Sequence, residues 1–134
     1  LASLAGIRWI RLLYAYPASI TEDLLQTIAI EEKICKYLDI PIQHIDDELL
    51  KAMNRKGESS HIREVIGRTR TMIPDMALRT SLIVGFPGET KPKFNRLLAF
   101  IREVRFDHLG VFNYSREERT IAASFKLLVR RSIL

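Results

Sequence analysis

Short apolar runs alternate along this chain with longer stretches in which apolar residues recur every three or four positions. Short runs rich in β-branched and aromatic side chains are typical of strands, and a period of three to four is typical of amphipathic helices. The runs predict strands at residues 7–16, 37–42, 81–84 and 109–114. The stretches between them predict helices at residues 22–34, 46–53, 59–73 and 89–105.

Polar residues at the helix starts support this interpretation. Thr21 is a suitable N-cap for the first helix, and the two acidic residues after it favour the positive end of the helix. Ser59 or Ser60 is expected to cap the third helix. Residues 120–134 form a basic stretch that could be a further helix, so the predicted order is β-α-β-α-α-β-α-β-α.

Strands joined by helical crossovers pair in parallel, so the predicted fold class is α/β with about four parallel strands. A closed (β/α) barrel has eight such units and about 250 residues, whereas this chain has 134 residues. The pattern therefore leaves two arrangements. One is a small open sheet, and the other is a partial barrel whose earlier strands lie outside the sequence.

The third predicted strand leads into the most distinctive turn of the chain. Residues 78–90 read LRTSLIVGFPGET, a strand followed by a turn with Gly85 and Gly88 and then by a helix start. Parallel strands present ligand sites at their carboxyl ends, and glycine lets a ligand approach the backbone closely. The patterns GxxxxGK[ST] and GxGxxG are both absent. Because ordinary strand-to-helix turns also use glycine and proline, the turn alone does not identify a ligand.

Composition narrows the class of protein. A hydrophobic fraction of 47% with 28% charged residues is ordinary for a globular domain, and no apolar run has the length of a membrane span or signal peptide. The single cysteine excludes an internal disulfide and a multi-thiolate metal site within this chain, and it fits a reducing cytoplasm. The net charge of +5 is compatible with an acidic partner such as RNA.

Few side chains indicate chemistry on their own. His44 follows the second strand beside Gln43, where a histidine can serve a ligand or face solvent. Asp39 lies in the second predicted strand and Arg79 in the polar start of the third, just before its apolar run at residues 81–84. A buried carboxylate needs a cation, so we expect the two to pair if the strands are neighbours. Cys35 is expected to pack as a small hydrophobe. These residues alone indicate a ligand-binding α/β unit.

The order of residues adds a specific resemblance, to the radical S-adenosylmethionine (SAM) methylthiotransferases. The similar segments are WIRL at residues 9–12, AYP at 15–17, YLDIPIQH at 37–44, LRTSLIVGFPGET at 78–90 and GVFNYS at 110–115. The resemblance is closest to the members that methylthiolate an aspartate of a small-subunit ribosomal protein. The members that modify adenosine in transfer RNA share IVGFPGET but usually read LPVQSGS from residue 40 onward.

The resemblance implies that residues 1–123 are the C-terminal part of a radical SAM (β/α) barrel domain, followed by an atypical basic tail at residues 124–134. It implies that the turn at residues 85–89 cradles the adenine of SAM, with Ile83 and Phe86 against the ring. Strand-end polar groups are expected to face the cofactor or the substrate. The implied cofactor-binding residues are Gln43, His44, Arg79, Ile83, Gly85, Phe86, Pro87, Gly88, Glu89, Tyr114 and Ser115.

The chain also departs from the family pattern. Members of the family hold a reducing [4Fe–4S] cluster with CxxxCxxC and a second cluster in an N-terminal domain, but this chain has one cysteine. Neither cluster is therefore expected to form within it, no metal ligand is assigned, and the isolated polypeptide is predicted to be inactive. Lys91 and Lys93 stand where the family usually has acidic residues, which places cations unfavourably at a helix N-terminus.

The leading hypothesis is a fragment of a cytoplasmic methylthiotransferase whose partner is a small-subunit ribosomal protein. One alternative is a fragment of the enzyme that modifies transfer RNA. Another is a non-enzymatic basic module that binds RNA or the ribosome, for which Lys126, Arg130 and Arg131 could supply a basic patch. A third is a truncated product without function, whose partial barrel would leave sheet edges unpaired.

Overall fold

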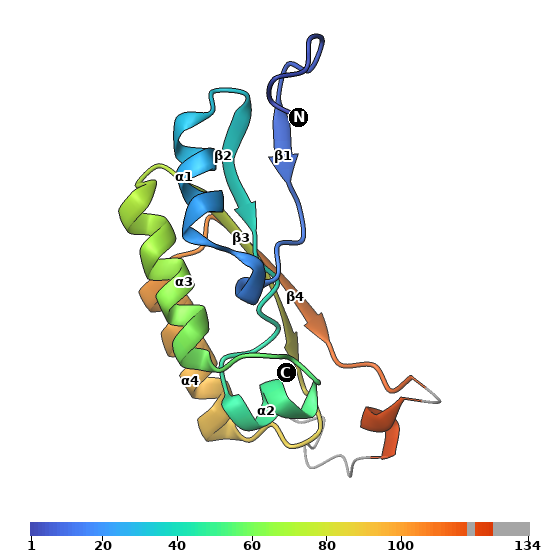
Figure 1. Ribbon diagram of the computed structural model, residues 1–134. Helices are drawn as coiled ribbons and strands as arrows, with labels where there is room; N and C mark the ends of the chain where they lie inside the picture. The colour runs from blue at the N-terminus through green and yellow to red at the C-terminus, as the bar shows by residue number, and fades with distance from the viewer. Residues whose placement is uncertain (118–119, 125–134) are drawn as a thin grey trace.

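The computed structural model of the chain contains one four-stranded sheet with helices packed on one face (Figure 1). It describes residues 1–117 and 120–124. In chain order the elements are β1 (Ile10–Leu12), the 3-10 helix η1 (Pro17–Ser19), α1 (Glu22–Ile30), β2 (Ile34–Asp39), α2 (Asp47–Ala52), α3 (Ser59–Met72), β3 (Ala77–Val84), α4 (Lys91–Val104), β4 (His108–Asn113) and the 3-10 helix η2 (Ile121–Ser124).

The strands lie in the order β1-β2-β3-β4, and each pair of neighbours is parallel. Helices form each connection, which confirms the predicted parallel α/β fold. Strands that follow one another in sequence and in space are typical of a (β/α) barrel, whereas a doubly wound sheet reverses its order. Among the described residues the sheet does not close, and β1 and β4 are its edges.

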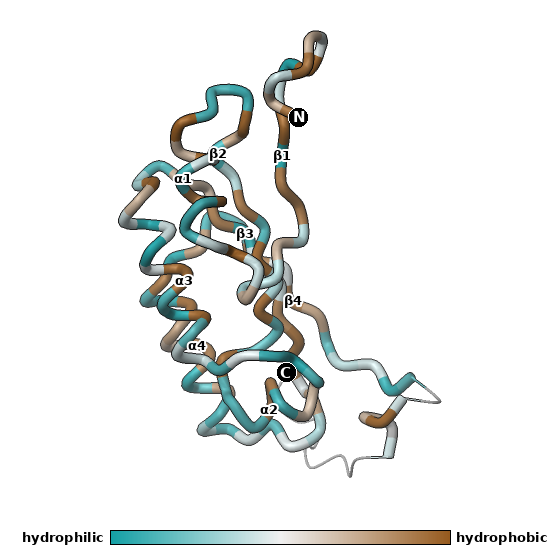
Figure 2. The backbone as a smooth tube through the Cα atoms, viewed as in Figure 1, coloured by the Kyte–Doolittle hydropathy of each residue, from teal (hydrophilic) through white to brown (hydrophobic). Residues whose placement is uncertain are grey.

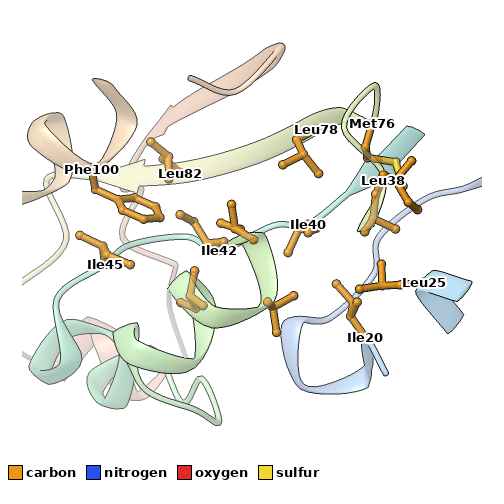
Figure 3. Close-up of a cluster of buried hydrophobic side chains, with 14 of the residues drawn as sticks. Ile20, Leu25, Leu38, Ile40, Ile42, Ile45, Met76, Leu78, Leu82 and Phe100 are labelled. Atoms are coloured by element: carbon orange, nitrogen blue, oxygen red, sulfur yellow. The ribbon is translucent and has the colours of Figure 1, made fainter. Parts of the chain in front are cut away.

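The hydrophobic core lies between the sheet and its helices. Helices α1, α3 and α4 are on the same side of the strands in Figure 1, and α2 lies at the end to which the strand arrows point. Figure 3 shows side chains of β2, β3 and the segment after β2, including Leu38, Ile40 and Leu82, directed into this layer, where Phe100 of α4 joins them. All four are at most 1% exposed. In Figure 2 hydrophobic positions follow the strands, while hydrophilic positions predominate before and along α3.

Three predicted strands have different bounds in the structure, and for the third the predicted residues 81–84 are only the second half of β3. The strand predicted at residues 7–16 is reduced to β1, which pairs with β2 in an irregular register. Tyr14 has a φ of 61°, which does not continue a strand. The strand predicted at residues 37–42 begins earlier, at Ile34, because α1 ends at Ile30. The ammonium of Lys36 donates to the carbonyl of Ala29 at 3.1 Å, which satisfies the end of α1.

The predicted cap of α3 is also wrong. Neither Ser59 nor Ser60 is the N-cap, which is Glu58, and its side chain makes no capping hydrogen bond. The Ser59 N–H donates instead to Oδ1 of Asp47 at 2.6 Å, so the start of α2 satisfies the start of α3. The prediction of Thr21 as N-cap of α1 is confirmed, because its hydroxyl accepts the N–H of Leu24 at 3.2 Å.

The end of the chain gives little further detail. Residues 121–124 form the short helix η2, and most of the stretch at 120–134 lies outside the described residues. The proposed division at residue 123 therefore stays a prediction. Among the described residues no helix is long and apolar enough to cross a membrane.

Candidate functional site

Three segments that are distant in sequence meet at the carboxyl end of the sheet. The chain after β2 continues beside β3, because Gln43 donates its N–H to the carbonyl of Ser81 and accepts the N–H of Ile83, both at 2.9 Å. Tyr114 follows β4 and donates its N–H to the carbonyl of Val84 at 2.8 Å. Gln43, the glycine turn after β3 and Tyr114 therefore share one rim, as expected for parallel strands.

The glycine turn at residues 85–89 has a backbone that favours glycine. Gly85 has a φ of +76° and Gly88 a φ of +92°, in the region that other residues rarely adopt. A Cβ placed on Gly85 would meet no other atom within 4 Å, so this backbone borders open space. The N–H of Glu89 donates to the carbonyl of Phe86 at 2.9 Å and closes the turn. A flat ligand could thus approach the Gly85 backbone without meeting a side chain there.

A buried histidine and a buried carboxylate form hydrogen bonds on the buried side of this turn. His44 is 0% exposed and its Nε2 lies 3.1 Å from Oε1 of Glu89, which is 7% exposed. The other oxygen of Glu89, Oε2, accepts the N–H of Gly85. The N–H of Asp46 donates to Nδ1 of His44 at 2.9 Å. A contact chain therefore runs from the start of α2 to the first residue of the glycine turn.

An aromatic pair forms the side of the rim next to the turn. The rings of Phe86 and Tyr114 meet edge to face, with centroids 5.1 Å apart and planes at 72°. Phe86 is 4% exposed. The hydroxyl of Tyr114 is buried and has no hydrogen-bond partner among the described residues. A buried hydroxyl without a partner is unfavourable, and this one is covered by protein atoms, so a ligand group would reach it only if neighbouring side chains moved.

The remaining predicted site residues lie at or next to this rim, except for Arg79. Ile83 and Gln43 are half-buried, Pro87 is buried and Ser115 is exposed. Arg79 lies in the first half of β3, and the six residue steps from it to Gly85 span about 20 Å. Its guanidinium pairs with Asp39 of β2, as the sequence suggested. The roles of these residues toward a cofactor stay predictions.

A cluster of charges between the start of α2 and the first turns of α4 was not predicted from the sequence. Its members are Asp46, Glu48, Lys93 and Arg96. Burial raises the pKa of the Asp46 carboxyl, but hydrogen bonds from Arg96 and from the Leu49 N–H, with the charge of Lys93, outweigh it and hold the pKa below its ordinary value of 3.8. A hydrogen bond to Glu48 raises the pKa of Lys93 above its ordinary value. Asp46, the N-cap of α2, and Glu48 thus compensate Lys93, whose cation was expected to be unfavourable at the N-terminus of α4.

A groove of about 540 Å³ is lined by the start of α2 and by side chains of α3 and α4, and no residue of the glycine turn lines it. Its charged side chains are already paired with each other or with neighbours, as Arg63 is with Glu103 and Arg96 with Asp46. The groove offers no convergent free groups, so the rim is the better candidate. The described residues contain no group of three or more His, Cys, Asp or Glu side chains that could hold a metal ion.

Comparison with known proteins gives three related results. The sequence model of the radical SAM superfamily matches residues 2–101. The ribosomal protein uS12 methylthiotransferase RimO of Syntrophus aciditrophicus is 61% identical over 122 residues, which are 91% of this chain and 27% of that protein. The enzyme of the same name from Geobacter sulfurreducens is 63% identical over 123 residues, which are 92% of this chain and 28% of that protein.

The chain therefore spans little more than a quarter of the length of these relatives. Among solved structures, coproporphyrinogen III oxidase (HemN) from Escherichia coli, described as a radical SAM enzyme, is similar with a TM-score of 0.67. The two are 25% identical, and the similarity covers 81% of this chain and 24% of the oxidase. The partial coverage agrees with a sheet that does not close among the described residues.

Proposed function

Because the chain belongs to the radical SAM superfamily, we propose that it forms the adenosine-binding part of a methylthiotransferase that modifies ribosomal protein uS12. The identity of 61% and 63% to uS12 methylthiotransferases, over nine-tenths of the chain, supports this choice above the transfer-RNA enzyme. The modified residue that we propose is an aspartate of uS12, and the reaction would take place in the cytoplasm.

The observation that carries the proposal is the rim formed by the glycine turn and Tyr114. The space beside the Gly85 backbone leaves room for a flat ring such as adenine, and half-buried Ile83 and buried Phe86 are apolar residues next to it. The buried hydroxyl of Tyr114 lacks a partner among the described residues, and it would bond to a nitrogen of adenine or a ribose hydroxyl once the side chains that cover it move aside for the ligand. SAM, when bound, supplies the adenosyl and methyl groups that this family uses.

The iron–sulfur clusters of the family do not fit the residues of this chain. A [4Fe–4S] cluster needs several thiolates, and the sequence contains only Cys35. We therefore propose that the isolated chain binds the adenosine part of SAM without cleaving it. Production of 5′-deoxyadenosine by the isolated chain after reconstitution with iron and sulfide would contradict this.

Saturation-transfer NMR with the isolated chain and SAM tests the binding directly. We expect saturation of the adenine protons of SAM in the presence of the chain. Tyr114→Phe removes a hydroxyl that has no described partner, so it should leave the stability to urea unchanged or slightly raised while it weakens SAM binding about threefold to tenfold. Tyr14→Phe is the matched control, because Tyr14 is 72% exposed on the surface.

Two results would overturn the proposal. One is the absence of adenine saturation with the folded wild-type chain. The other is equal SAM affinity in the Tyr114→Phe and wild-type chains. Salt-dependent binding of RNA that SAM does not affect would favour the basic module instead.

A further inference from the structure

We propose that His44 is a positioning residue, which acts through Glu89 to fix the Gly85 end of the glycine turn for SAM. The expectation from the sequence was that His44 faces the cofactor or the substrate. In the structure it is fully buried and contacts Glu89, not open space. The inference rests on the proposed function for the identity of the ligand, but not for the contacts themselves.

The hydrogen bonds of His44 determine which nitrogen carries its proton. Nδ1 accepts the N–H of Asp46 and therefore has no proton of its own. Nε2 then carries the proton and donates to Oε1 of Glu89. The histidine thus has one acceptor and one donor, and each faces the partner that it requires.

Glu89 is constrained in the same way. Its Oε1 faces the Nε2–H of His44 and its Oε2 faces the N–H of Gly85, so both oxygens must accept. A carboxylate meets this requirement, whereas a glutamine presents one oxygen and one NH₂ group. Glu89→Gln would therefore point a donor at a donor, either at His44 or at Gly85. The two hydrogen bonds therefore require a carboxylate at position 89, and a glutamine of the same size cannot replace it.

The hydrogen bond between Glu89 and Gly85 affects the ligand site because Gly85 borders the space where the ligand would bind. Gly85 is the first residue after β3, its φ is positive, and its backbone borders the open space of the rim. The bond from its N–H to Glu89 fixes the direction in which the turn leaves the strand. Phe86, which packs on Tyr114, is the next residue along. Loss of the bond should therefore loosen the backbone and the aromatic ring against which adenine would lie.

Two substitutions separate the two hydrogen bonds of His44. In His44→Gln the amide NH₂ can replace Nε2 and donate to Glu89, but the Asp46 N–H loses its acceptor. In His44→Asn the amide oxygen can replace Nδ1 and accept from Asp46, but Glu89 loses its donor. Each variant loses one buried bond, so the pair is matched in cost to folding. His61→Gln is the control on a half-exposed histidine of α3.

The experiment is performed on the full chain labelled with ¹⁵N. The readouts are the amide shift and hydrogen exchange of Gly85, the nitrogen shifts of the His44 ring and the Kd for SAM. We expect a ring protonated at Nε2 in the wild type. In His44→Asn and Glu89→Gln the Gly85 amide should exchange faster and move upfield, and SAM should bind roughly tenfold more weakly. His44→Gln should stay within about threefold of wild type, as should His61→Gln.

Equal Gly85 signals in His44→Gln and His44→Asn would overturn the proposal, because His44 would then only fill space. A ring protonated at Nδ1 would overturn it too. If His44→Asn changes the Gly85 amide but the wild-type chain binds no SAM, the positioning contact is supported and the proposed function fails. If SAM binds and His44→Asn affects neither the Gly85 amide nor the Kd, the proposed function stands and the positioning role fails.

Discussion

Asp39 is a buried carboxylate that forms an ion pair with one neighbour in the sheet, Arg79. It is 5% exposed in β2, and both of its oxygens lie 2.9 Å from Nη1 of Arg79 in β3. The parallel register places the two residues directly opposite each other. Because the Arg79 side chain is 35% exposed, it remains partly hydrated while it compensates the carboxylate. The pair therefore adds a side-chain contact to the backbone ladder that aligns β2 with β3.

We expect Arg79→Met to destabilise the fold by about 2 kcal/mol, because it leaves a buried carboxylate without its cation. The value is below that of a fully buried pair since water reaches Arg79. The double variant Asp39→Asn with Arg79→Met should be more stable than Arg79→Met alone, because no charge is then left unpaired. Urea denaturation of the two single variants and the double variant measures this. A double variant as unstable as the sum of the singles would contradict the argument.

This pair could be predicted from the sequence because opposite charges in two neighbouring strands have few other partners. The side-chain direction of His44 could not be predicted in the same way. Gln43, the residue before it, has a φ of +68°, and such a local reversal leaves no signal in the hydrophobic pattern. The chain turns there, and His44 is buried under the glycine turn. Only the three-dimensional arrangement shows that its partner is Glu89, 45 residues later.

At the scale of the elements, α2 and α4 are joined through the first turns of both helices. The ammonium of Lys93 in α4 lies 3.4 Å from Oδ1 of Asp46, the N-cap of α2, and 2.5 Å from Oε2 of Glu48. The cation opposes the helix dipole of α4 but meets two carboxylates. The contact between helices therefore outweighs the preference within the single helix.

We expect Lys93→Glu to destabilise the fold by roughly 1–2 kcal/mol, although a carboxylate suits the N-terminus of an isolated helix. The new carboxylate would face Asp46, whose side chain is 8% exposed, and Glu48. Lys91→Glu is the matched control, because Lys91 is exposed at the first position of the same helix. It should be neutral or stabilising by a few tenths of a kcal/mol. Thermal unfolding of both variants distinguishes the two, and equal effects would show that the dipole dominates.

The sequence predicts the types of the elements well and their bounds less well. The alternation of strands and helices follows from apolar periodicity alone. Tertiary contacts do not change the type of these elements in the structure. The start of β2 was missed because Ile34 continues the apolar stripe of α1, so the pattern contains no boundary between helix and strand. The cap of α3 was missed because Asp47, from another helix, replaces a local serine. Contacts between distant segments decide both cases.

At the scale of the whole molecule, the sheet has two edges that the described residues leave unpaired. Large apolar side chains line the β4 edge, where Val111 is 54% exposed and Phe112 is 57% exposed. Trp9 and Leu13 flank β1 at the other edge and are 63% and 65% exposed. Unpaired backbone groups beside apolar surface are a template for pairing with another chain. The same surface would be covered in a closed barrel.

We therefore expect the isolated chain to self-associate as its concentration rises, which sedimentation velocity would show as an increasing weight-average sedimentation coefficient. Val111→Lys places a charge on the exposed edge strand, where water still reaches the side chain. It should weaken the association several-fold at little cost to folding, because pairing would bury the new ammonium. Asn95→Lys adds the same charge on an exposed position of α4, away from both edges, and should leave the association unchanged. If both lysines weaken it equally, net charge and not the open edge controls the behaviour of the chain. A wild-type chain that is monomeric at every concentration would show that the edges are protected by some other means.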